Sequence, residues 1–221
     1  MAKISSTFKK RRIDNFAAWR AQAKAEGRIP SSYPPLEKNQ ELAFLIGMVL
    51  GDGHIQKFSR TESLNISLGT DKPDLWQFTE RVVKNVFNKD PHVYKVKSSA
   101  CMVIRLYQKK ISARLGIPEG NRGKIKIVLP QWIWGKRGCL IACVRGLYEA
   151  EGSFCVHEPT YTYKMLFSNK NDSLLNFMYT ALEELGFHPH RSPYKIQISR
   201  KQEAYALKEQ ISFRNYSHKY S

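Results

Sequence analysis

The chain has 221 residues and a mass of 25.6 kDa, with 36 Lys and Arg against 19 Asp and Glu, so its formal net charge is +17. Its 42% hydrophobic and 12% aromatic residues exclude a disordered basic tail, and its longest apolar runs are too short for a membrane-spanning helix. We therefore expect a folded, strongly cationic protein whose polyanionic partner is nucleic acid, because neutralising phosphates releases counterions.

Residues 1–38 are expected to form a basic N-terminal extension. They carry nine basic and three acidic residues, a local charge of +6. Asp14 is a candidate cap for a short helix that runs to Glu26 and stops at Gly27. The run Lys9–Arg12 is compatible with a targeting signal and equally with an arm that contacts phosphates.

The most informative feature is an internal repeat. The segment Leu45–Gly53 (LIGMVLGDG) aligns with Val144–Gly152 (VRGLYEAEG) at a constant offset of 99 residues. Each is an apolar helical run that ends in an acid followed by glycine, a typical C-terminal stop of a helix. The acids Asp52 and Glu151 coincide in this alignment.

The segments after the two motifs also repeat in kind. The first half continues with strands at His54–Phe58 and Ser63–Leu68, a helix at Lys72–Asn88, strands near His92–Lys97 and Cys101–Tyr107, and a helix near Lys109–Leu115. The second continues with strands at Ser153–His157 and Tyr161–Ser168, a helix from Asp172 to Leu185, strands near Pro189–Arg191 and Lys195–Ser199, and a helix from Lys201 to Ile211. Each half is predicted as α-β-β-α-β-β-α, an α+β fold. We place the halves at residues 39–134 and 135–221.

A stripe of small residues predicts that the two motif helices pack against each other. Ala43, Gly47 and Gly51 align with Ala142, Gly146 and Ala150 at a spacing of four residues. Glycine inside a helix costs about 1 kcal/mol relative to alanine, so its presence favours a close approach of two backbones. Such pairing brings Asp52 and Glu151 together.

Two neighbouring carboxylates at the negative ends of helix dipoles repel each other unless a cation lies between them. Oxygen ligands open to solvent and phosphate suit Mg²⁺, which can activate water for phosphodiester hydrolysis. Glu149 is another acid of the second motif, but its counterpart is Leu50. We therefore favour the position that is acidic in both halves.

The two nonapeptides and the repeats after them resemble the LAGLIDADG homing endonucleases, specifically the monomeric class with two motifs in one chain. The resemblance covers residues 38–221 and departs from the family pattern at Leu50 and Arg145, neither of which is a metal acid. It implies two four-stranded antiparallel sheets that form a saddle over double-stranded DNA. It also implies cleavage of both strands across the minor groove of a long, asymmetric target site, in the manner of intron-encoded enzymes.

The same resemblance implies a set of site residues. Asp52 and Glu151, with the preceding Gly51 and Ala150, are the candidate ligands of Mg²⁺, for which Mn²⁺ or Ca²⁺ are substitutes. A basic residue late in each half assists at the scissile phosphate in this family. Lys124, 72 residues after Asp52, and Lys219, 68 after Glu151, are the candidates, with Arg122 and His218 as alternatives.

The face of each sheet that helices leave uncovered is the candidate DNA interface, because alternate residues of a strand point to opposite faces. We expect Ile55, Phe154 and Val156 to point inward. The residues expected to face DNA are His54, Gln56, Ser63, Asn65, Ser67, Arg105, Tyr107, Ser153, Cys155, His157, Lys195, Gln197 and Ser199. Lys95, Lys97, Lys164 and Arg191, which lie in the same predicted strands, complete the set.

Two further interpretations concern function and compartment. A non-cleaving nucleic-acid-binding protein of the same fold, such as an intron RNA maturase or a transcription regulator, is the alternative function. The cysteines form no CxxC pair, which is typical of buried thiols in a reducing, intracellular compartment; they are Cys101, Cys139, Cys143 and Cys155.

Overall fold

The structure is a computed structural model that describes residues 16–29, 32–121, 123 and 125–216. Contacts divide the chain into two compact units, Met1–Pro34 and Pro35–Ser221. This boundary lies before residue 38, because Leu36 is already buried in the core of the second unit. None of the helices in the described ranges has the length and apolar composition that crossing a membrane requires.

The first unit contains the helix α2 (Ala17–Ala25). It ends before Gly27, whose φ of +70° is the left-handed conformation that favours glycine. The residue before the helix is Phe16, which makes no side-chain cap, and the proposed cap Asp14 lies outside the described residues. The ring of Trp19 is half-exposed, with the guanidinium of Arg28 5.7 Å from its centre.

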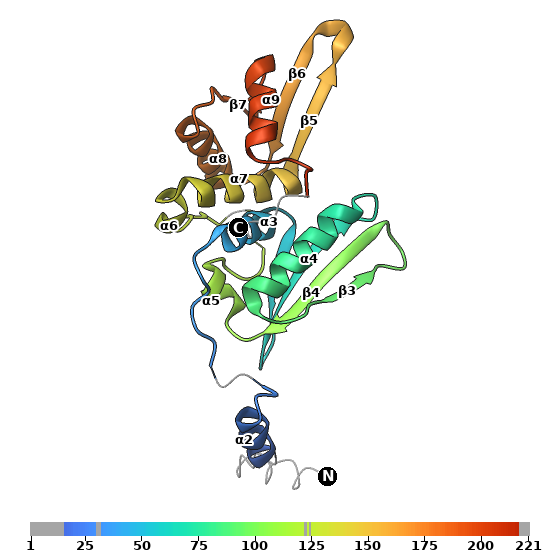
Figure 1. The fold of residues 1–221 in the computed structure, drawn as a ribbon, viewed down its shortest axis with the longest axis vertical. Helices are drawn as coiled ribbons and strands as arrows, with labels where there is room; N and C mark the ends of the chain where they lie inside the picture. The colour runs from blue at the N-terminus through green and yellow to red at the C-terminus, as the bar shows by residue number, and fades with distance from the viewer. Residues whose placement is uncertain (1–15, 30–31, 122, 124, 217–221) are drawn as a thin grey trace, which may run out of the picture. The chain divides into compact units, whose positions relative to one another are not determined.

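The second unit contains two halves of the same element order (Figure 1). The first half consists of α3 (Gln40–Asp52), β1 (Gly53–Lys57), β2 (Glu62–Gly69), α4 (Pro73–Phe87), β3 (His92–Lys95), β4 (Cys101–Gln108) and α5 (Ile111–Leu115). The second consists of α7 (Arg137–Glu151), β5 (Gly152–His157), β6 (Thr162–Ser168), α8 (Asp172–Glu184), β7 (His190–Ser192), β8 (Lys195–Ile198) and α9 (Lys201–Gln210). The short helices α6 (Gln131–Trp134) and η1 (Glu158–Thr160) were not expected from the sequence.

Each half forms a four-stranded antiparallel sheet, in the orders β1-β2-β4-β3 and β5-β6-β8-β7. The first hairpin of each sheet has an equivalent register, with Gly53 opposite Ile66 and Gly152 opposite Phe167. The predicted α+β class and the predicted order of elements are confirmed. Observed ends differ from the expected ones by one or a few residues.

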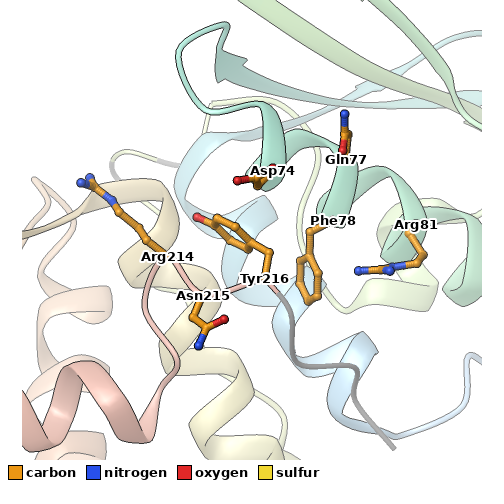
Figure 2. Close-up of a pocket in the computed structure, with 7 residues that line it drawn as sticks. All are labelled: Asp74, Gln77, Phe78, Arg81, Arg214, Asn215 and Tyr216. Atoms are coloured by element: carbon orange, nitrogen blue, oxygen red, sulfur yellow. The ribbon is translucent and has the colours of Figure 1, made fainter.

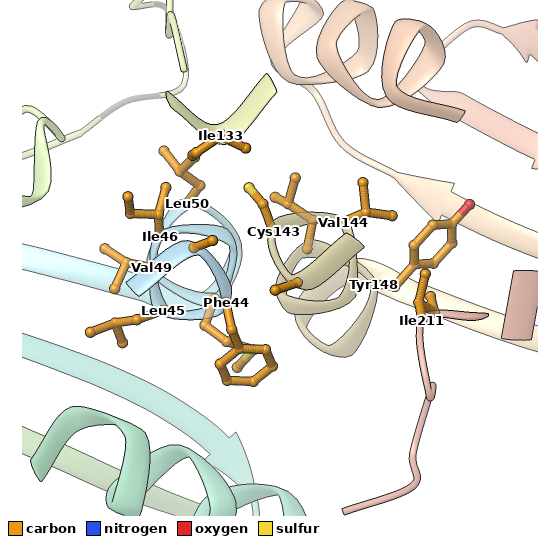
Figure 3. Close-up of a cluster of buried hydrophobic side chains, with 14 of the residues drawn as sticks. Phe44, Leu45, Ile46, Val49, Leu50, Ile133, Cys143, Val144, Tyr148 and Ile211 are labelled. Atoms are coloured by element: carbon orange, nitrogen blue, oxygen red, sulfur yellow. The ribbon is translucent and has the colours of Figure 1, made fainter. Parts of the chain in front are cut away.

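The helices α3 and α7 join the halves through direct backbone contact. A Cβ atom built on Gly47 would lie 2.9 Å from the Leu147 nitrogen, and one on Gly146 would lie 2.8 Å from the Met48 nitrogen. Figure 3 shows the two helices side by side, with large side chains such as Phe44 and Tyr148 on their flanks. The predicted close packing along the small-residue stripe is confirmed, because no side chain larger than hydrogen fits at either glycine.

One face of each sheet packs on the helices and forms the core. Ile55, Ile66 and Ile104 of the first sheet and Met165 and Ile196 of the second are fully buried there. The prediction that Val156 points into the core is wrong: its side chain is 42% exposed. Val156 lies on the edge strand β5, opposite Tyr163 of β6. Tyr163 is buried and packs against Tyr205 of α9, so the inner strand is covered at this row whereas the edge strand is not.

The four cysteines are free thiols, but only two are buried. Cys139 and Cys143 lie in the core on α7, where burial raises the pKa of both thiols. Cys155 is exposed on β5, so the expectation that the thiols are buried fails for this residue. The reason is its position on the uncovered face of the second sheet.

Candidate active site and nucleic-acid interface

Asp52 and Glu151 are the last residues of α3 and α7, so the pairing of these helices brings the two carboxylates together. A Cβ atom built on Gly51 would lie 3.2 Å from Cγ of Glu151, and it would also meet the methyl group of Ala150. Both acids are partly buried. The duplicated acids of the sequence therefore share one location at the joined ends of the motif helices.

The glycines after the acids are required by close approach rather than by a left-handed turn. Gly53 and Gly152 have extended backbone, with φ of −90° and −99°. A Cβ on Gly53 would lie 2.6 Å from the carbonyl oxygen of Val49, and one on Gly152 would lie 2.5 Å from that of Tyr148. Glycine lets the chain turn directly from helix to strand against the last helical turn, which places each acid at the start of a sheet.

Burial and mutual repulsion shape the electrostatics of the acidic pair. Burial and, to a smaller extent, the charge of Glu151 raise the pKa of Asp52 to about 7, while the cation of Lys72 opposes both effects. Burial also raises the pKa of Glu151. Each carboxylate thus loses hydration on folding and gains a negative neighbour, an arrangement that a bound cation would relieve.

Two residues that the sequence analysis missed lie next to these acids. Lys72 precedes α4 and acts electrostatically on Asp52. Asn169, which follows β6, donates from Nδ2 to Oε1 of Glu151 at 3.4 Å. Both lie in the connection between the second strand and the following helix of their half. This shared position is the signal that identifies them, since that connection returns the chain to the end of the motif helix.

The donor set fits a magnesium ion that keeps most of its water. In the part of the chain that the structure describes, no group of three or more His, Cys, Asp and Glu side chains gathers as a metal site. Two carboxylates suffice for Mg²⁺, which is commonly bound by one or two carboxylates together with water and substrate phosphate oxygens. The residues before the acids, Gly51 and Ala150, belong to the last helical turn, where carbonyl oxygens lack helical partners.

The predicted basic residues at the scissile phosphate stay predictions. Lys124 and Lys219, together with their alternatives Arg122 and His218, lie outside the described residues. Lys72 is the cation whose charge acts on Asp52 within the described part of the chain.

The strand register arranges the outer residues, on the face opposite the core, in rows across each sheet. In the first sheet the central row is His54, Asn65, Arg105 and His92. On the same face, one neighbouring row is Gln56, Ser63 and Tyr107, and the other is Ser67, Val103 and Tyr94. In the second sheet the equivalent row is Ser153, Leu166, Gln197 and His190. Next to it on the same face lie the pairs Cys155–Lys164 and His157–Thr162 in one direction, and the row Ser168, Lys195, Ser192 in the other. Ser199 follows β8 and is exposed. Most of the predicted DNA-facing set thus shares the outer faces.

Four candidates do not lie on an accessible outer face. Ser63 is only 1% exposed, and Asn65 donates to its hydroxyl oxygen at 3.1 Å. Lys95 pairs with Met102 and therefore shares the register of the core face, at the sheet edge. Lys97 lies in the turn after β3. Arg191 pairs with Ile196 and bonds to Asp172 (3.1 Å) and Asn176 of α8, so its predicted outward orientation is wrong.

The other motif acid, Glu149, has a structural environment of its own. It is buried and accepts hydrogen bonds from the backbone N–H of Arg214 (2.6 Å) and the hydroxyl of Tyr216 (2.7 Å). Arg145, one turn earlier, donates to the carbonyl of Asn215 at 2.7 Å, with its guanidinium 4.7 Å from the ring centre of Phe78. These two residues thus bind the C-terminal segment to α7.

This C-terminal segment also borders a pocket against α4 (Figure 2). Its lining residues are Asp74, Gln77, Phe78, Arg81, Arg214, Asn215 and Tyr216. The rings of Tyr216 and Phe78 lie 5.8 Å apart, so the end of the second half packs on the first. Neither Asp52 nor Glu151 lines this pocket, which is therefore separate from the acidic pair.

Comparison with known proteins gives one family match and several structural matches. Residues 39–115 match the model of the LAGLIDADG-like domain, whereas a comparison with curated protein sequences gives no match. The complex of I-DmoI with DNA and Mn is 17% identical, covers 83% of this chain and 100% of its own, and has a TM-score of 0.55. The complex of I-DmoI with DNA and Ca is 19% identical over 79% of this chain and 90% of its own, with a TM-score of 0.51.

A second protein shares this fold. Full-length DUF199/WhiA from Thermatoga maritima is 15% identical, covers 82% of this chain and 58% of its own, and has a TM-score of 0.57. The family model covers the first half of the second unit, and the structural matches extend over both halves. Residues 39–115 therefore match a LAGLIDADG-like domain, and the chain as a whole shares the fold of the homing endonuclease I-DmoI.

Proposed function

We propose that this protein is a site-specific, metal-dependent endonuclease that hydrolyses both strands of a double-stranded DNA target across the minor groove, as an intron-encoded homing enzyme does. The observation that carries the proposal is the meeting of Asp52 and Glu151 at the joined ends of two equivalent helices. Duplex DNA has two antiparallel strands related by a local twofold axis, so one carboxylate from each half matches one scissile phosphate on each strand. I-DmoI, whose fold this chain shares, is a homing endonuclease crystallised with DNA and Mn.

The acidic pair is the proposed site for Mg²⁺, with Mn²⁺ or Ca²⁺ as substitutes. Asp52 and Glu151 would hold the ion through their side chains, and Gly51 and Ala150 through backbone carbonyl oxygens. When bound, the ion supplies the positive charge that activates water and stabilises the oxygens of the phosphodiester. I-DmoI has been crystallised with DNA in the presence of Mn, Ca and Mg, which supports the choice of ions.

The residues of the chain itself have three proposed tasks. Asn169 holds the carboxylate of Glu151 in place through its 3.4 Å hydrogen bond. Lys72 keeps positive charge beside Asp52 and favours its ionised form. Lys124 and Lys219 would assist at the scissile phosphates. Outer-face side chains would read a long, asymmetric target as a monomer, and the net charge of +17 favours phosphate contact.

The fold is shared by I-DmoI and by DUF199/WhiA, so the choice between a cleaving and a binding protein rests on the site residues. The alternative is a non-cleaving nucleic-acid-binding protein, such as a maturase or a transcription regulator. Retention of an acid at both motif ends favours cleavage: two partly buried carboxylates side by side are unfavourable unless they bind a cation.

The test is cleavage of a randomised duplex library by the purified full chain with Mg²⁺, followed by sequencing of the cut ends. We expect one family of cut sequences. Asp52→Asn and Glu151→Gln should each reduce double-strand cleavage at least about a thousandfold, a loss of about 4 kcal/mol of transition-state stabilisation. Glu184→Gln is the matched control, because Glu184 is an exposed acid at the end of α8.

Two outcomes would contradict the proposal. In the first, wild-type protein binds a selected sequence but cuts neither strand with Mg²⁺ or Mn²⁺, which would favour the binding alternative. In the second, Asp52→Asn cuts both strands at the wild-type rate, which would exclude the acidic pair as the active site.

A further inference from the structure

The outer face of the first sheet presents one arginine, Arg105, in a fixed setting. Arg105 lies in the row that begins with His54, the second residue after Asp52, and continues through Asn65 to His92 at the far edge. This face is the proposed DNA-binding surface of the first half. The row is therefore among the positions nearest to the acidic pair on that surface.

Two contacts hold the Arg105 side chain, and each is supported by a neighbour. Its Nε donates to Oδ1 of Asn65 at 2.6 Å, and Nδ2 of Asn65 donates to the hydroxyl oxygen of Ser63 at 3.1 Å. Its guanidinium carbon lies 5.0 Å from the ring centre of Tyr94. That ring in turn stacks on His92, with centroids 5.3 Å apart. The guanidinium is thus held by a hydrogen bond at Nε and by an aromatic ring against one of its planar faces.

The remaining donors of Arg105 are not engaged within the described residues. The hydrogen bond to Asn65 uses Nε, and no described carboxylate forms an ion pair with the guanidinium. The Nη1 and Nη2 amino groups therefore keep their N–H donors for a ligand on the outer face. Because the side chain is already ordered, it loses little rotamer entropy when these donors bind.

We propose that Arg105 selects a guanine in the half of the DNA target that the first sheet covers, by donating from its two Nη groups to O6 and N7 of that base. The proposal rests on the proposed DNA-binding function. Guanine presents two adjacent acceptors in the major groove, whereas adenine presents a donor beside its N7 acceptor, and the pyrimidines lack an acceptor pair. A guanidinium that offers only donors discriminates between these patterns.

The corresponding row of the second sheet lacks this chemistry. It consists of Ser153, Leu166, Gln197 and His190, with Gln197 in the place of Arg105 and Leu166 in the place of Asn65. The register of the two rows is equivalent, because each starts two residues after the motif acid. The guanine preference is therefore confined to one half-site, which makes the target asymmetric at this position.

Asn65 and Tyr94 act as positioning residues in this scheme. Asn65 fixes the rotation of the guanidinium through Nε, and Tyr94 fixes its plane. Removing either contact leaves the charge of Arg105 in place but frees its orientation. Base preference should then weaken while overall attraction to DNA stays.

The experiment is a binding selection on a randomised duplex library with the full chain in metal-free buffer, so that cleavage is not needed. We expect one first-half position to be enriched in guanine about 10-fold to 100-fold over other bases. Arg105→Lys, which keeps the charge, should reduce this preference at least about fivefold, and Arg105→Gln should shift it towards adenine. Asn65→Ser should give an intermediate loss. Arg191→Lys is the control and should leave every preference unchanged, because Arg191 bonds to α8.

Separate outcomes would overturn this inference and the proposed function. Guanine enrichment that survives in Arg105→Lys and Arg105→Gln would overturn the inference, as would a wild-type selection without a guanine position. A guanine position that responds to these variants, in a protein that cuts no DNA with Mg²⁺, would support the inference and contradict the endonuclease. Thermal unfolding of each variant, expected within a few degrees of wild type, confirms that the lost preference is not a loss of fold.

Discussion

In the first half of the molecule the motif acid lies beside a cation, whereas in the second half it is bound by an amide. Lys72 acts on Asp52, and Asn169 donates to Glu151. The outer faces differ in the same way, with a fixed Arg105 in one row and Gln197 in its equivalent. Yet the helix ends and the first-hairpin registers are the same in both halves.

This comparison separates two kinds of constraint on the sequence. The halves agree where backbones touch, at Gly47 and Gly146 and at the glycines after the acids, because a single added carbon would collide there. They differ where side chains reach outward, because each side faces its own strand of an asymmetric ligand under the proposed function. Substitutions at shared and at unshared positions test how far this separation holds.

The largest effect is expected from Gly146→Ala, which breaks the contact that the halves share. The new methyl group would lie 2.8 Å from the Met48 nitrogen and would also collide with the carbonyl oxygen of Phe44. Since neither backbone atom can move without shifting α3, we expect a loss of about 3 kcal/mol in the free energy of unfolding. Denaturant unfolding measures this loss. Gly135→Ala is the control, because its nearest non-neighbouring atom lies 3.8 Å away; equal costs for both variants would refute the backbone-contact argument.

A smaller effect is expected from Tyr216→Phe. This variant tests the hydrogen bond between the C-terminal segment and Glu149 of α7, a feature of the second half. The variant removes the 2.7 Å hydrogen bond to the buried Glu149 but keeps the ring against Phe78. We expect a loss of about 1.5 kcal/mol, because a buried carboxylate loses a donor. Tyr161→Phe should cost nothing measurable, since Tyr161 is 82% exposed at the end of the β5–β6 hairpin. Unchanged stability of Tyr216→Phe would show that this hydrogen bond to Glu149 does not contribute to the free energy of unfolding.

The acidic pair should make the metal-free protein less stable as pH rises. The pKa of Asp52 is about 7 in the folded state, above its ordinary value of 3.8, so the folded protein binds more protons between these values. Stability therefore falls as pH increases from about 4 to 7 and then levels off. In Asp52→Asn this fall should shrink, with a gain on the order of 1 kcal/mol at pH 7 after allowance for solvent screening. Denaturant unfolding at pH 5 and pH 7 in the presence of a chelator measures the fall in wild type and the gain in Asp52→Asn. A wild-type protein that gains stability from pH 5 to pH 7 would contradict the raised pKa of Asp52.

The smallest effect is expected on the rate of cleavage, from a variant that changes the surroundings of Asp52 and leaves those of Glu151 intact. Lys72→Gln removes the cation beside Asp52, so the carboxylate ionises less readily and one strand should be cut about 3-fold to 5-fold more slowly. Strand-specific labelling of a duplex target separates the two cuts. Lys170→Gln, an exposed lysine in the equivalent connection of the second half, is the control. Equal slowing of both strands would indicate that Lys72 contributes to DNA binding in general rather than to Asp52.

Sequence alone determined the architecture because its signals are local or periodic. The two nonapeptides at an offset of 99, the small residues at a spacing of four and the alternation in the strands predicted the halves, their pairing and the meeting of Asp52 with Glu151. The exposure of Val156 and the burial of Ser63 could not be derived in this way. The first depends on which strand of the sheet a helix covers, and the second on which side chains lie beside the residue in the folded sheet.

The tertiary structure alone decided which partners the site residues have. Lys72 and Asn169 carry no motif of their own, and Arg191 and Arg105 look alike in the sequence. Strand pairing directs the side chain of Arg191, on β7, to α8. It directs the side chain of Arg105 to Asn65 and Tyr94 on the outer face of the first sheet. A side chain's electrostatic environment depends on groups that lie far away along the chain and close in space. The duplicated acids can therefore be predicted from the sequence, whereas the differences between their surroundings arise only when the chain is folded.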